Sequence, residues 1–292
     1  MLREALSDLV VTDQLIDQLG PAAIAQTSLF LYGPTGNGKT SLAERLLRIY
    51  SDLIVIPYAV EVDTQIIILY DPAVHQHVEI KDLHIDPRWV VCRRPSISVG
   101  GELVGSMLEL RLDEASGLYA APIQMKANNG ILIVDDFGRQ VMAPRDLLNR
   151  WIVPLDRRVD YLTLRYGVKF QVPFELMVVF ATNLDPSELA DEAFLRRIRN
   201  KVFVEPVSPE SFDEILRRVI AGKNIPAEAD CAEVLRQLCL RCAPALRACY
   251  PFDICNILMA ISEYEGRPPS LNRADLERAV ALYFTRTLAV VD

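Results

Sequence analysis

Gly33-Pro34-Thr35-Gly36-Asn37-Gly38-Lys39-Thr40 is the stretch that decides the fold, because it satisfies the pattern G-x-x-x-x-G-K-[ST] in full. It follows the short apolar run Leu29–Tyr32, which predicts a strand. It leads into residues 41–49, whose apolar side chains recur at helical spacing. Strand, glycine-rich turn and helix are the context in which this motif forms a phosphate-binding loop. A glycine-rich turn without a ligand is the alternative, and the two flanking elements disfavour it.

Each residue type in this loop suits a polyphosphate. The three glycines lack the Cβ atoms that would keep the backbone from wrapping an anion. The helix that begins near Lys39 favours negative charge at its N-terminus. Lys39 is long enough to reach the β- and γ-phosphates, and the Thr40 hydroxyl is a candidate magnesium ligand. The expected nucleotide-binding residues are Gly33, Pro34, Thr35, Gly36, Asn37, Gly38, Lys39, Thr40 and Ser41.

Composition limits the possible classes of protein. The chain has 292 residues, 51% of them apolar, which is enough for one large domain or two smaller ones. A net charge of −8 and a pI near 5.1 argue against a broad basic surface and so disfavour a nucleic-acid partner. A local basic patch remains compatible with this composition. The sequence has neither an apolar run of roughly 20 residues nor a signal-peptide pattern at its N-terminus. We therefore expect a cytoplasmic protein without membrane insertion, and the start so close to the loop suggests a fragment of a longer chain.

Two carboxylates follow a buried strand in the middle of the chain. Residues 131–134 are Ile-Leu-Ile-Val, a run typical of a strand buried on both faces of a parallel sheet, and Asp135 and Asp136 come directly after it. Ligands bind at this edge of such sheets. In phosphoryl transfer one acid there holds the magnesium shell through water, and a second can polarise the attacking water. We assign Asp135 to the metal and Asp136 to the water; two solvated aspartates at the start of a loop are the alternative.

A second buried run, residues 176–182, ends at Asn183. Its position in the sheet would place Asn183 beside the two aspartates, where the amide could orient the attacking water. An asparagine that simply starts a loop is the alternative.

Residues 188–198 predict a helix that ends in Arg196 and Arg197. Arginines in the last turn of a helix complement its dipole, which is one explanation for them. The other is an arginine finger, a side chain that offsets the charge on the γ-phosphate of a neighbouring subunit's nucleotide.

By composition the chain divides into three parts: residues 1–27, 28–207 and 208–292. The first predicts helices at 3–10 and 13–19 and a turn at Gly20-Pro21. The second carries the alternating strands and helices of an α/β domain. After the cap signal Ser208-Pro209 only helices are expected, at 210–221, 229–243, 252–264 and 272–288.

Several other segments carry weaker signals. Residues 53–56 predict a strand, 58–69 a hairpin, 93–101 a turn, 102–112 a helix, and 159–174 a hairpin that turns near Gly167. His75 and His77 are one residue apart, but no acid or thiol stands at ligand spacing, so we expect no metal there. Cys239 and Cys242 form a single C-x-x-C without a second pair, which favours buried thiols over zinc.

In their order these motifs resemble the AAA+ ATPase family over roughly residues 20–290. The resemblance implies a P-loop NTPase with a parallel five-stranded sheet flanked by helices, a C-terminal all-helical lid domain, and ATP and Mg²⁺ as cofactors. It makes residues 33–40 Walker A, Asp135 and Asp136 Walker B, Asn183 sensor 1, and Arg197 or Arg196 the finger. Lys39, Asp136, Asn183, Arg197 and Arg196 would then act in catalysis. The hairpin before sensor 1 is similar to that of the clade with MoxR-like ATPases, magnesium chelatase subunits and bacterial enhancer-binding activators.

Three positions depart from the family pattern. Residues 107–114 lack the Gly-Ala-Phe-Thr-Gly-Ala loop of the enhancer-binding activators, which argues against transcriptional activation. Walker B usually ends in Asp-Glu, whereas Asp136 is one methylene shorter. The lid usually presents a sensor 2 arginine where this chain has Phe252 or Cys255, and Arg247 is a possible substitute.

The resemblance implies an ATP-hydrolysing motor that remodels a protein partner, built as a hexameric ring of identical subunits with active sites shared between neighbours. A slow or non-hydrolysing ATP-dependent switch or scaffold is the alternative, because Asp136 and the missing lid arginine would slow turnover. The long insertions and Asn183 disfavour a small-molecule kinase. Residues 200–203 are Asn-Lys-Val-Phe and lack the aspartate of a guanine-binding motif, which disfavours a GTPase. Residues 102–117 and the hairpin near Gly167 are the expected contacts for the partner.

Overall fold

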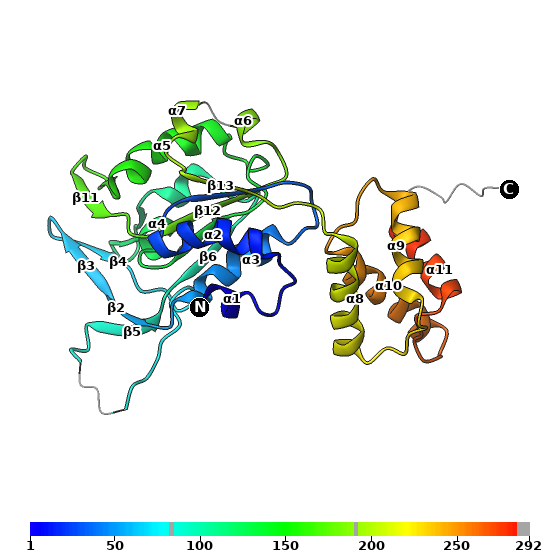
Figure 1. Ribbon diagram of the computed structural model, residues 1–292. Coiled ribbons are helices and arrows are strands. Elements are labelled where there is room, and N and C mark those ends of the chain that lie inside the picture. The colour runs from blue at the N-terminus through cyan, green and yellow to red at the C-terminus, as the bar shows by residue number, and fades with distance from the viewer. Residues whose placement is uncertain (82–84, 190–191, 285–292) are drawn as a thin grey trace. The chain divides into compact units, whose positions relative to one another are not determined.

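The computed structural model of the chain contains the parallel five-stranded sheet that the motif order implies (Figure 1). The strand order is β13-β1-β12-β9-β6, and every neighbouring pair runs parallel. The strands are β1 (Leu29–Tyr32), β6 (Ser96–Val99), β9 (Ile131–Val134), β12 (Met177–Thr182) and β13 (Asn200–Phe203). The structure describes residues 1–81, 85–189 and 192–284.

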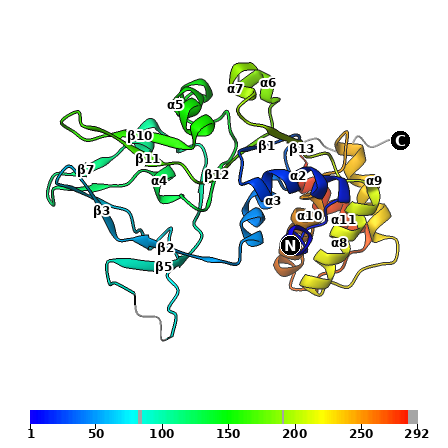
Figure 2. The same ribbon diagram turned by 60° about the vertical axis from the view of Figure 1, so that its left-hand side comes forward.

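Helices cover both faces of this sheet, which is why its central strands are continuous apolar runs (Figure 1 and Figure 2). On one face, Phe30, Leu132 and Phe180 pack in one cluster with the fully buried Trp151 of α5 (Pro144–Arg157). On the other face, α2 (Asp13–Ala25) contacts β13, and α3 (Lys39–Leu46) contacts β1, β12 and β9. β9 and β12 are neighbours in the sheet, and Val134, the last residue of β9, pairs with Phe180, two residues before the end of β12.

The apolar run at residues 53–56, which predicts a strand, does not belong to the five-stranded sheet. That run, β2 (Leu53–Pro57), pairs antiparallel with β5 (Trp89–Arg93) outside the main sheet. The edge position is taken by β6, in a stretch for which we expected only a turn. Ile97 and Val99 are buried while Ser96 and Ser98 are exposed, so β6 has the alternation of an edge strand.

The helix expected at residues 102–112 is wrong. The segment forms the short 3₁₀ helix η2 (Gly105–Leu108) and then β7 (Arg111–Asp113). Leu103 and Leu108 are buried in the cluster under the main sheet, whereas Leu110 and Leu112 pack against a second cluster. A single helix cannot reach both clusters, so the chain crosses between them in extended form. In the second cluster β7 joins a sheet of order β3-β4-β8-β7, with β3 (Ala59–Val62), β4 (Gln65–Ile68) and β8 (Leu118–Ala120).

Both expected hairpins are present: β3 with β4, and β10 (Val159–Thr163) with β11 (Lys169–Pro173). A buried ion pair anchors the second. Asp160 is 1% exposed and accepts hydrogen bonds from two nitrogens of Arg150 on α5, at 2.5 and 3.1 Å, and from Gln124 of α4 (Ile123–Lys126) at 3.0 Å. These bonds tie the base of the hairpin to two helices.

The N-terminal helices differ from their expected bounds. The first, α1, spans only Leu2–Ala5, and η1 (Leu47–Ile49) follows α3. The turn expected at Gly20-Pro21 is wrong, because α2 continues through both residues to Ala25. Ala22 and Ala23 are buried, so the packing of this last stretch outweighs the hydrogen bond that Pro21 cannot donate.

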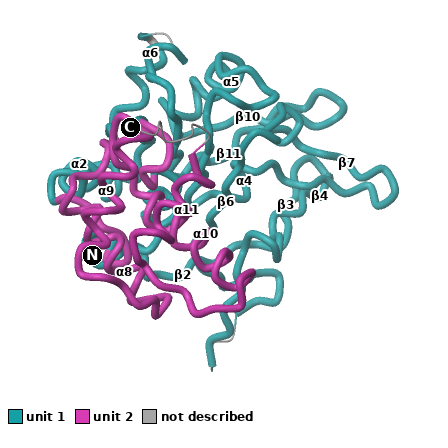
Figure 3. Tube along the Cα trace, turned by 90° about the vertical axis from the view of Figure 1, so that its right-hand side faces the viewer, with its two compact units in different colours: residues 1–6, 13–33, 39–203 teal, residues 7–12, 34–38, 204–292 magenta. Residues whose placement is uncertain are grey.

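Contacts divide the chain into two units, coloured separately in Figure 3. Unit 1 comprises Met1–Leu6, Asp13–Gly33 and Lys39–Phe203. Unit 2 comprises Ser7–Thr12, Pro34–Gly38 and Val204–Asp292. The central residues of the glycine-rich loop thus group with the helical part of the chain, while Gly33 and Lys39 group with the sheet.

Unit 2 contains the expected helices: α8 (Pro209–Lys223), α9 (Cys231–Cys242), α10 (Tyr250–Tyr264) and α11 (Arg273–Tyr283). Two begin at the expected caps, because Ser208 Oγ accepts from the Ser211 N–H at 3.2 Å and Asn272 Oδ1 from the Asp275 N–H at 2.9 Å. The end expected for the last helix, near residue 288, lies outside the described residues. The four helices share one core, in which Phe212, Leu235, Ile254, Leu258 and Leu276 are fully buried or nearly so.

Candidate functional site

The backbone of the glycine-rich loop has the shape that its glycines predict. Gly33, Gly36 and Gly38 have φ values of 134°, 83° and 81°, a region that residues with a Cβ rarely adopt. α3 begins directly after the loop, at Lys39. The Lys39 side chain is 9% exposed, and its Nζ donates to the Gly33 carbonyl at 2.9 Å. The ammonium therefore lies against the first residue of the loop.

The five loop residues Pro34, Thr35, Gly36, Asn37 and Gly38 belong to unit 2. Within that unit the loop touches the turn before α10. The Cys249 N–H donates to the Gly36 carbonyl at 2.9 Å, and the Ala248 N–H donates to Asn37 Oδ1 at 3.3 Å. No local sequence pattern predicts these contacts, because 211 residues separate Asn37 from Ala248.

Thr40 and Asp135 meet in unit 1. Thr40 Oγ1 lies 3.0 Å from Asp135 Oδ1 and 2.9 Å from Oδ2, so the hydroxyl donates to the carboxylate. α3 supplies the threonine and the end of β9 supplies the aspartate. A hydroxyl and a carboxylate are the hard oxygen donors that Mg²⁺ prefers, and a site of few protein oxygens suits an ion that keeps several waters. Among the described residues, no cluster of three or more His, Cys, Asp or Glu side chains that could hold a metal occurs.

Asp136 adopts a left-handed backbone conformation, with φ 46°. Aspartate tolerates this conformation better than glutamate does, because its short side chain can bond locally. The structure thus gives a physical reason for the shorter acid. Gln140, which sequence reasoning missed, braces this turn: its Nε2 donates to the carbonyls of Asp135 at 2.9 Å and Asp136 at 3.1 Å. Its Oε1 accepts from the Gly138 N–H at 2.8 Å.

Asn183 follows the strand beside the aspartates. The chain after Asp136 runs along the end of β12, where the Phe137 N–H donates to the Ala181 carbonyl at 2.8 Å and Thr182 Oγ1 donates to the Phe137 carbonyl at 2.7 Å. Asn183 Oδ1 is buried and has no hydrogen-bond partner among the described residues. A buried amide oxygen of this kind is free to accept from a bound water.

Arg196 and Arg197 directly follow Leu195, the last residue of α7 (Glu192–Leu195). The helices here are α6 (Pro186–Leu189) and α7, and residues 190 and 191 of the expected helix lie outside the described residues. Arg196 is 76% exposed and pairs with Glu192 at 2.6 Å. Arg197 is 26% exposed, and its Nε donates to Asp156 of α5 at 2.8 Å. Of the two, Arg196 projects more of its side chain into solvent.

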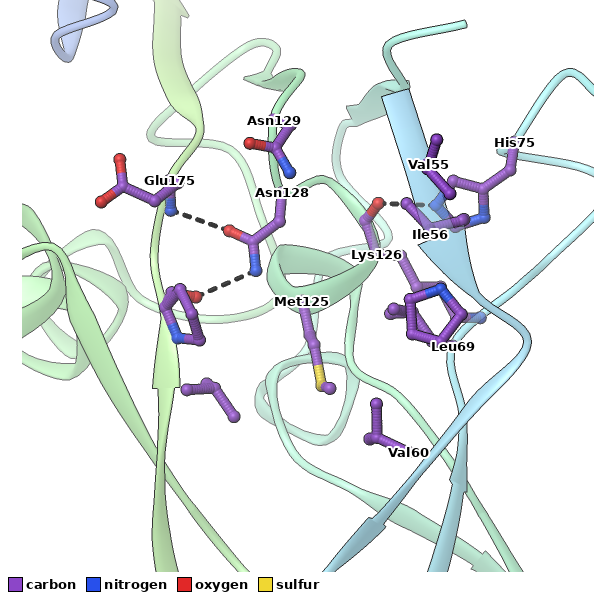
Figure 4. A pocket seen from close by; sticks show the side chains of 13 residues that line it. Val55, Ile56, Val60, Leu69, His75, Met125, Lys126, Asn128, Asn129 and Glu175 are labelled. Atoms are coloured by element: carbon purple, nitrogen blue, oxygen red, sulfur yellow. Dashed lines mark hydrogen bonds between the residues drawn. The ribbon is translucent and has the colours of Figure 1, made fainter. Parts of the chain in front are cut away.

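A separate cavity of about 380 Å³ lies in unit 1, between β2, α4 and β11 (Figure 4). Met125, Val60 and Leu69 contribute to its apolar lining, and His75 lies at its side. His75 Nδ1 accepts from the Asp71 N–H at 3.0 Å, and Nε2 lies 2.9 Å from the Lys126 carbonyl. Burial lowers the pKa of His75, which keeps the ring neutral. With both nitrogens engaged, His75 is a structural residue rather than a metal ligand.

The cysteines are free thiols. Burial raises the pKa of Cys239 to about 12, and that of Cys255 to about 11. Such thiols are packing residues at neutral pH, as the sequence predicts for Cys239.

A parallel sheet of order β13-β1-β12-β9-β6, a glycine-rich loop between its β1 and α3, and a C-terminal helical part together define a P-loop NTPase fold. Solved structures bear out this fold. A point mutant of RuvB from Thermotoga maritima matches with a TM-score of 0.57 and 12% identity, over 95% of this chain and 72% of that one. NtrX from Brucella abortus matches with a TM-score of 0.61 and 14% identity, over 100% of this chain and 60% of that one. This chain thus spans less than two thirds of NtrX.

NtrX in complex with ADP matches with a TM-score of 0.59 and 15% identity, over 100% of this chain and 60% of that one. A family model described as a domain of unknown function, DUF8689, matches residues 208–282. A comparison with curated protein sequences gives no significant match. Among the described residues, no helix has both the length and the apolar character that crossing a membrane requires.

Proposed function

We propose that the protein is a magnesium-dependent ATP hydrolase. The observation that carries this proposal is the contact of Thr40 with both carboxylate oxygens of Asp135, directly after a glycine-rich loop with left-handed glycines. Structures of NtrX with ATP and with ADP share the fold, which supports a nucleotide as the ligand.

The proposed roles follow from the position of each residue. The residues from Gly33 to Ser41 hold the phosphates, and Lys39 neutralises charge on the β- and γ-phosphates. Thr40 and Asp135 hold Mg²⁺, which would neutralise charge on the phosphate oxygens when bound. Asp136 accepts a proton from the attacking water, and Asn183 Oδ1 accepts a hydrogen bond from the same water and orients it.

The active protein in this proposal is a homo-oligomer, a hexameric ring in which Arg196 or Arg197 reaches the nucleotide of a neighbour. An arginine at that position would stabilise charge that develops on the γ-phosphate. Each arginine pairs with a carboxylate of unit 1, but the Arg196 side chain is 76% exposed against 26% for Arg197, which favours Arg196 as the residue that reaches outward. The ring would act in the cytoplasm on a protein partner, in the manner of MoxR-like ATPases, with residues 28–207 as the nucleotide-binding domain, 208–292 as the lid and 1–27 as an N-terminal segment.

The β10–β11 hairpin is the part of unit 1 best built to contact such a partner. Tyr166 at its turn is 61% exposed and Tyr161 on β10 is 42% exposed. The base of the hairpin is held by the Asp160–Arg150 pair, so a force applied at the tip is transmitted to α5. A protein partner is favoured over a nucleic acid by the net charge of −8.

The test is ATP binding and hydrolysis by the purified chain and by Lys39→Ala. We expect the wild type to bind ATP with magnesium and release phosphate over many turnovers, and Lys39→Ala to lose both properties. Unchanged ATP affinity in Lys39→Ala, together with no phosphate release from the wild type, would refute the assignment.

One observation favours a second function, an ATP-dependent switch or scaffold that turns over slowly. Asp136 has a shorter side chain than glutamate and is held in a left-handed turn by Gln140, so its carboxylate has limited reach toward a water. A single-turnover experiment decides between the two. Retention of one intact ATP per subunit for hours supports the switch, whereas steady multiple turnover rules it out.

A further inference from the structure

We propose that the side chain of Asn37 joins the bound nucleotide to the helical unit: its Oδ1 is held by the Ala248 N–H, and its Nδ2 donates to a phosphate oxygen. This inference rests on the proposed nucleotide site. Within that site it gives Asn37 two contacts, one with the phosphate and one with the turn before α10.

The orientation of the Asn37 amide is fixed by its partner. The two ends of an asparagine amide differ in chemistry, since Oδ1 only accepts and Nδ2 only donates. The Ala248 N–H is a donor and lies 3.3 Å from Oδ1, so the reversed orientation would place two donors against each other. With Oδ1 engaged, the hydrogen-bonding capacity that is left is that of the Nδ2 donor.

That donor is buried and unused. Asn37 is 6% exposed, and Nδ2 has no hydrogen-bond partner among the described residues. A buried donor without a partner lowers stability, and such groups usually have an acceptor in the functional state. Asn37 stands in the middle of the loop whose backbone suits an anion, so a phosphate oxygen is the acceptor that fits its surroundings.

A second contact aligns the adjacent peptide group. The Cys249 N–H holds the Gly36 carbonyl at 2.9 Å, and the peptide bond is trans. In a planar trans peptide the N–H points opposite to the carbonyl, so the Asn37 N–H is directed away from Cys249. The same turn therefore orients both a backbone and a side-chain donor of Asn37.

The fit at Gly36 is close. A Cβ built at Gly36 would lie 2.6 Å from Cys249 Sγ and 3.4 Å from Cδ of Arg247, so only glycine admits the turn at this distance. The turn orders the donors that meet the phosphate, so its packing against the loop should raise the affinity for the nucleotide. By thermodynamic linkage, a bound nucleotide should favour this packing by the same factor.

The variants Asn37→Ala, Asn37→Asp and Ala248→Pro separate the two bonds. Ala248 is the second residue of a turn in which the Tyr250 N–H donates to the Arg247 carbonyl, a position that favours proline, so Ala248→Pro removes the N–H with little strain. Ala248→Ser keeps the N–H and is its matched control. Asn37→Asp keeps Oδ1 and replaces the donor with a charged oxygen, and Thr35→Asp places the same charge on an exposed residue of the same loop.

The measurement is the equilibrium affinity of the full chain for a fluorescent ADP, with amide exchange at Ala248 followed in parallel. We expect Asn37→Ala to bind roughly tenfold more weakly, as for loss of a bond to a charged group. Asn37→Asp should lose more than both Asn37→Ala and Thr35→Asp. Ala248→Pro should lose affinity while Ala248→Ser does not, and the double variant Asn37→Ala/Ala248→Pro should be no weaker than Asn37→Ala. ADP should slow exchange of the Ala248 N–H in the wild type.

A purely structural role for Asn37 would leave Asn37→Asp no weaker than Thr35→Asp, which carries the same added charge, and that result would overturn the inference. Affinity of Asn37→Ala within twofold of the wild type would do the same. If Asn37→Ala does not fold, the comparison of Ala248→Pro with Ala248→Ser decides, and equal affinities refute the link. If the wild type binds no ADP at all, the proposed function fails, which is a different result from equal affinities among variants that all bind.

Discussion

Replacing Thr40 with valine tests the centre of the site, because valine keeps the shape of threonine and removes only the hydroxyl. In the wild type that hydroxyl lies 2.9 and 3.0 Å from the two oxygens of Asp135, a charge-assisted hydrogen bond in a partly buried place. Loss of such a bond should lower the free energy of unfolding by about 1.5 kcal/mol. For a unit of this size that corresponds to a fall in melting temperature of about 3 to 6 °C.

The same substitution removes a proposed magnesium ligand, so hydrolysis should fall by about 100-fold or more, equivalent to about 3 kcal/mol of transition-state stabilisation. Thermal melting without nucleotide measures the first effect, and phosphate release with magnesium and ATP measures the second. Thr40→Ser keeps the hydroxyl and is the control for both. Wild-type melting together with wild-type hydrolysis in Thr40→Val would refute the reasoning about this contact.

Three further perturbations test two contacts in the structure and the proposed site shared between subunits. Asp160→Ala should lower the free energy of unfolding by about 3 kcal/mol, because it leaves the largely buried Arg150 guanidinium with fewer acceptors. Denaturant titrations measure this change, and a loss under about 1 kcal/mol would contradict the anchoring of the hairpin. The Arg267 guanidinium, bonded to Asp275, holds the pKa of the Asp275 carboxyl below its ordinary 3.8. The ion pair therefore contributes its full stabilisation above pH 3.8, and this stabilisation is lost as the pH falls through the lower pKa of the folded state. Asp275→Asn should flatten the acid limb of a melting curve measured against pH, and an unchanged limb would contradict the pairing. Subunits with Arg196→Ala and Arg197→Ala, mixed into wild type, should depress ATP hydrolysis more than in proportion, and a strictly proportional loss would exclude a shared site.

The main sheet and the helices of unit 2 could be predicted from the sequence because their signals are local. Four consecutive apolar residues at 131–134, or a cap at Ser208, specify an element without reference to the rest of the chain. The stretch 102–112 could not be predicted in the same way, since its path depends on two clusters that Leu103 and Leu112 reach in different parts of the fold. In β6 the alternation of serine with Ile97 and Val99 is a signal for a strand. The flanking Pro95, Gly100 and Gly101 favour a turn instead, and the prediction followed them.

The site shows the same division. The loop, Thr40 and Asp135 were predicted from motif order, and their side chains meet in the structure. Gln140 and the turn at residues 247–249 were not predicted as parts of the site, because glutamine and alanine carry no chemical signature and act here through single hydrogen bonds. The left-handed turn at Asp136 likewise depends on how Gln140 closes the loop after β9. Motifs thus locate the candidate site residues, while the residues that hold them in place become visible only in the structure.

The central claim, that this chain hydrolyses ATP at its glycine-rich loop, is tested most directly by phosphate release from purified wild-type protein with magnesium, measured over a range of protein concentrations. The account predicts many turnovers per subunit, with a rate per subunit that rises with concentration as shared sites assemble. No phosphate release beyond one turnover at any concentration would contradict it.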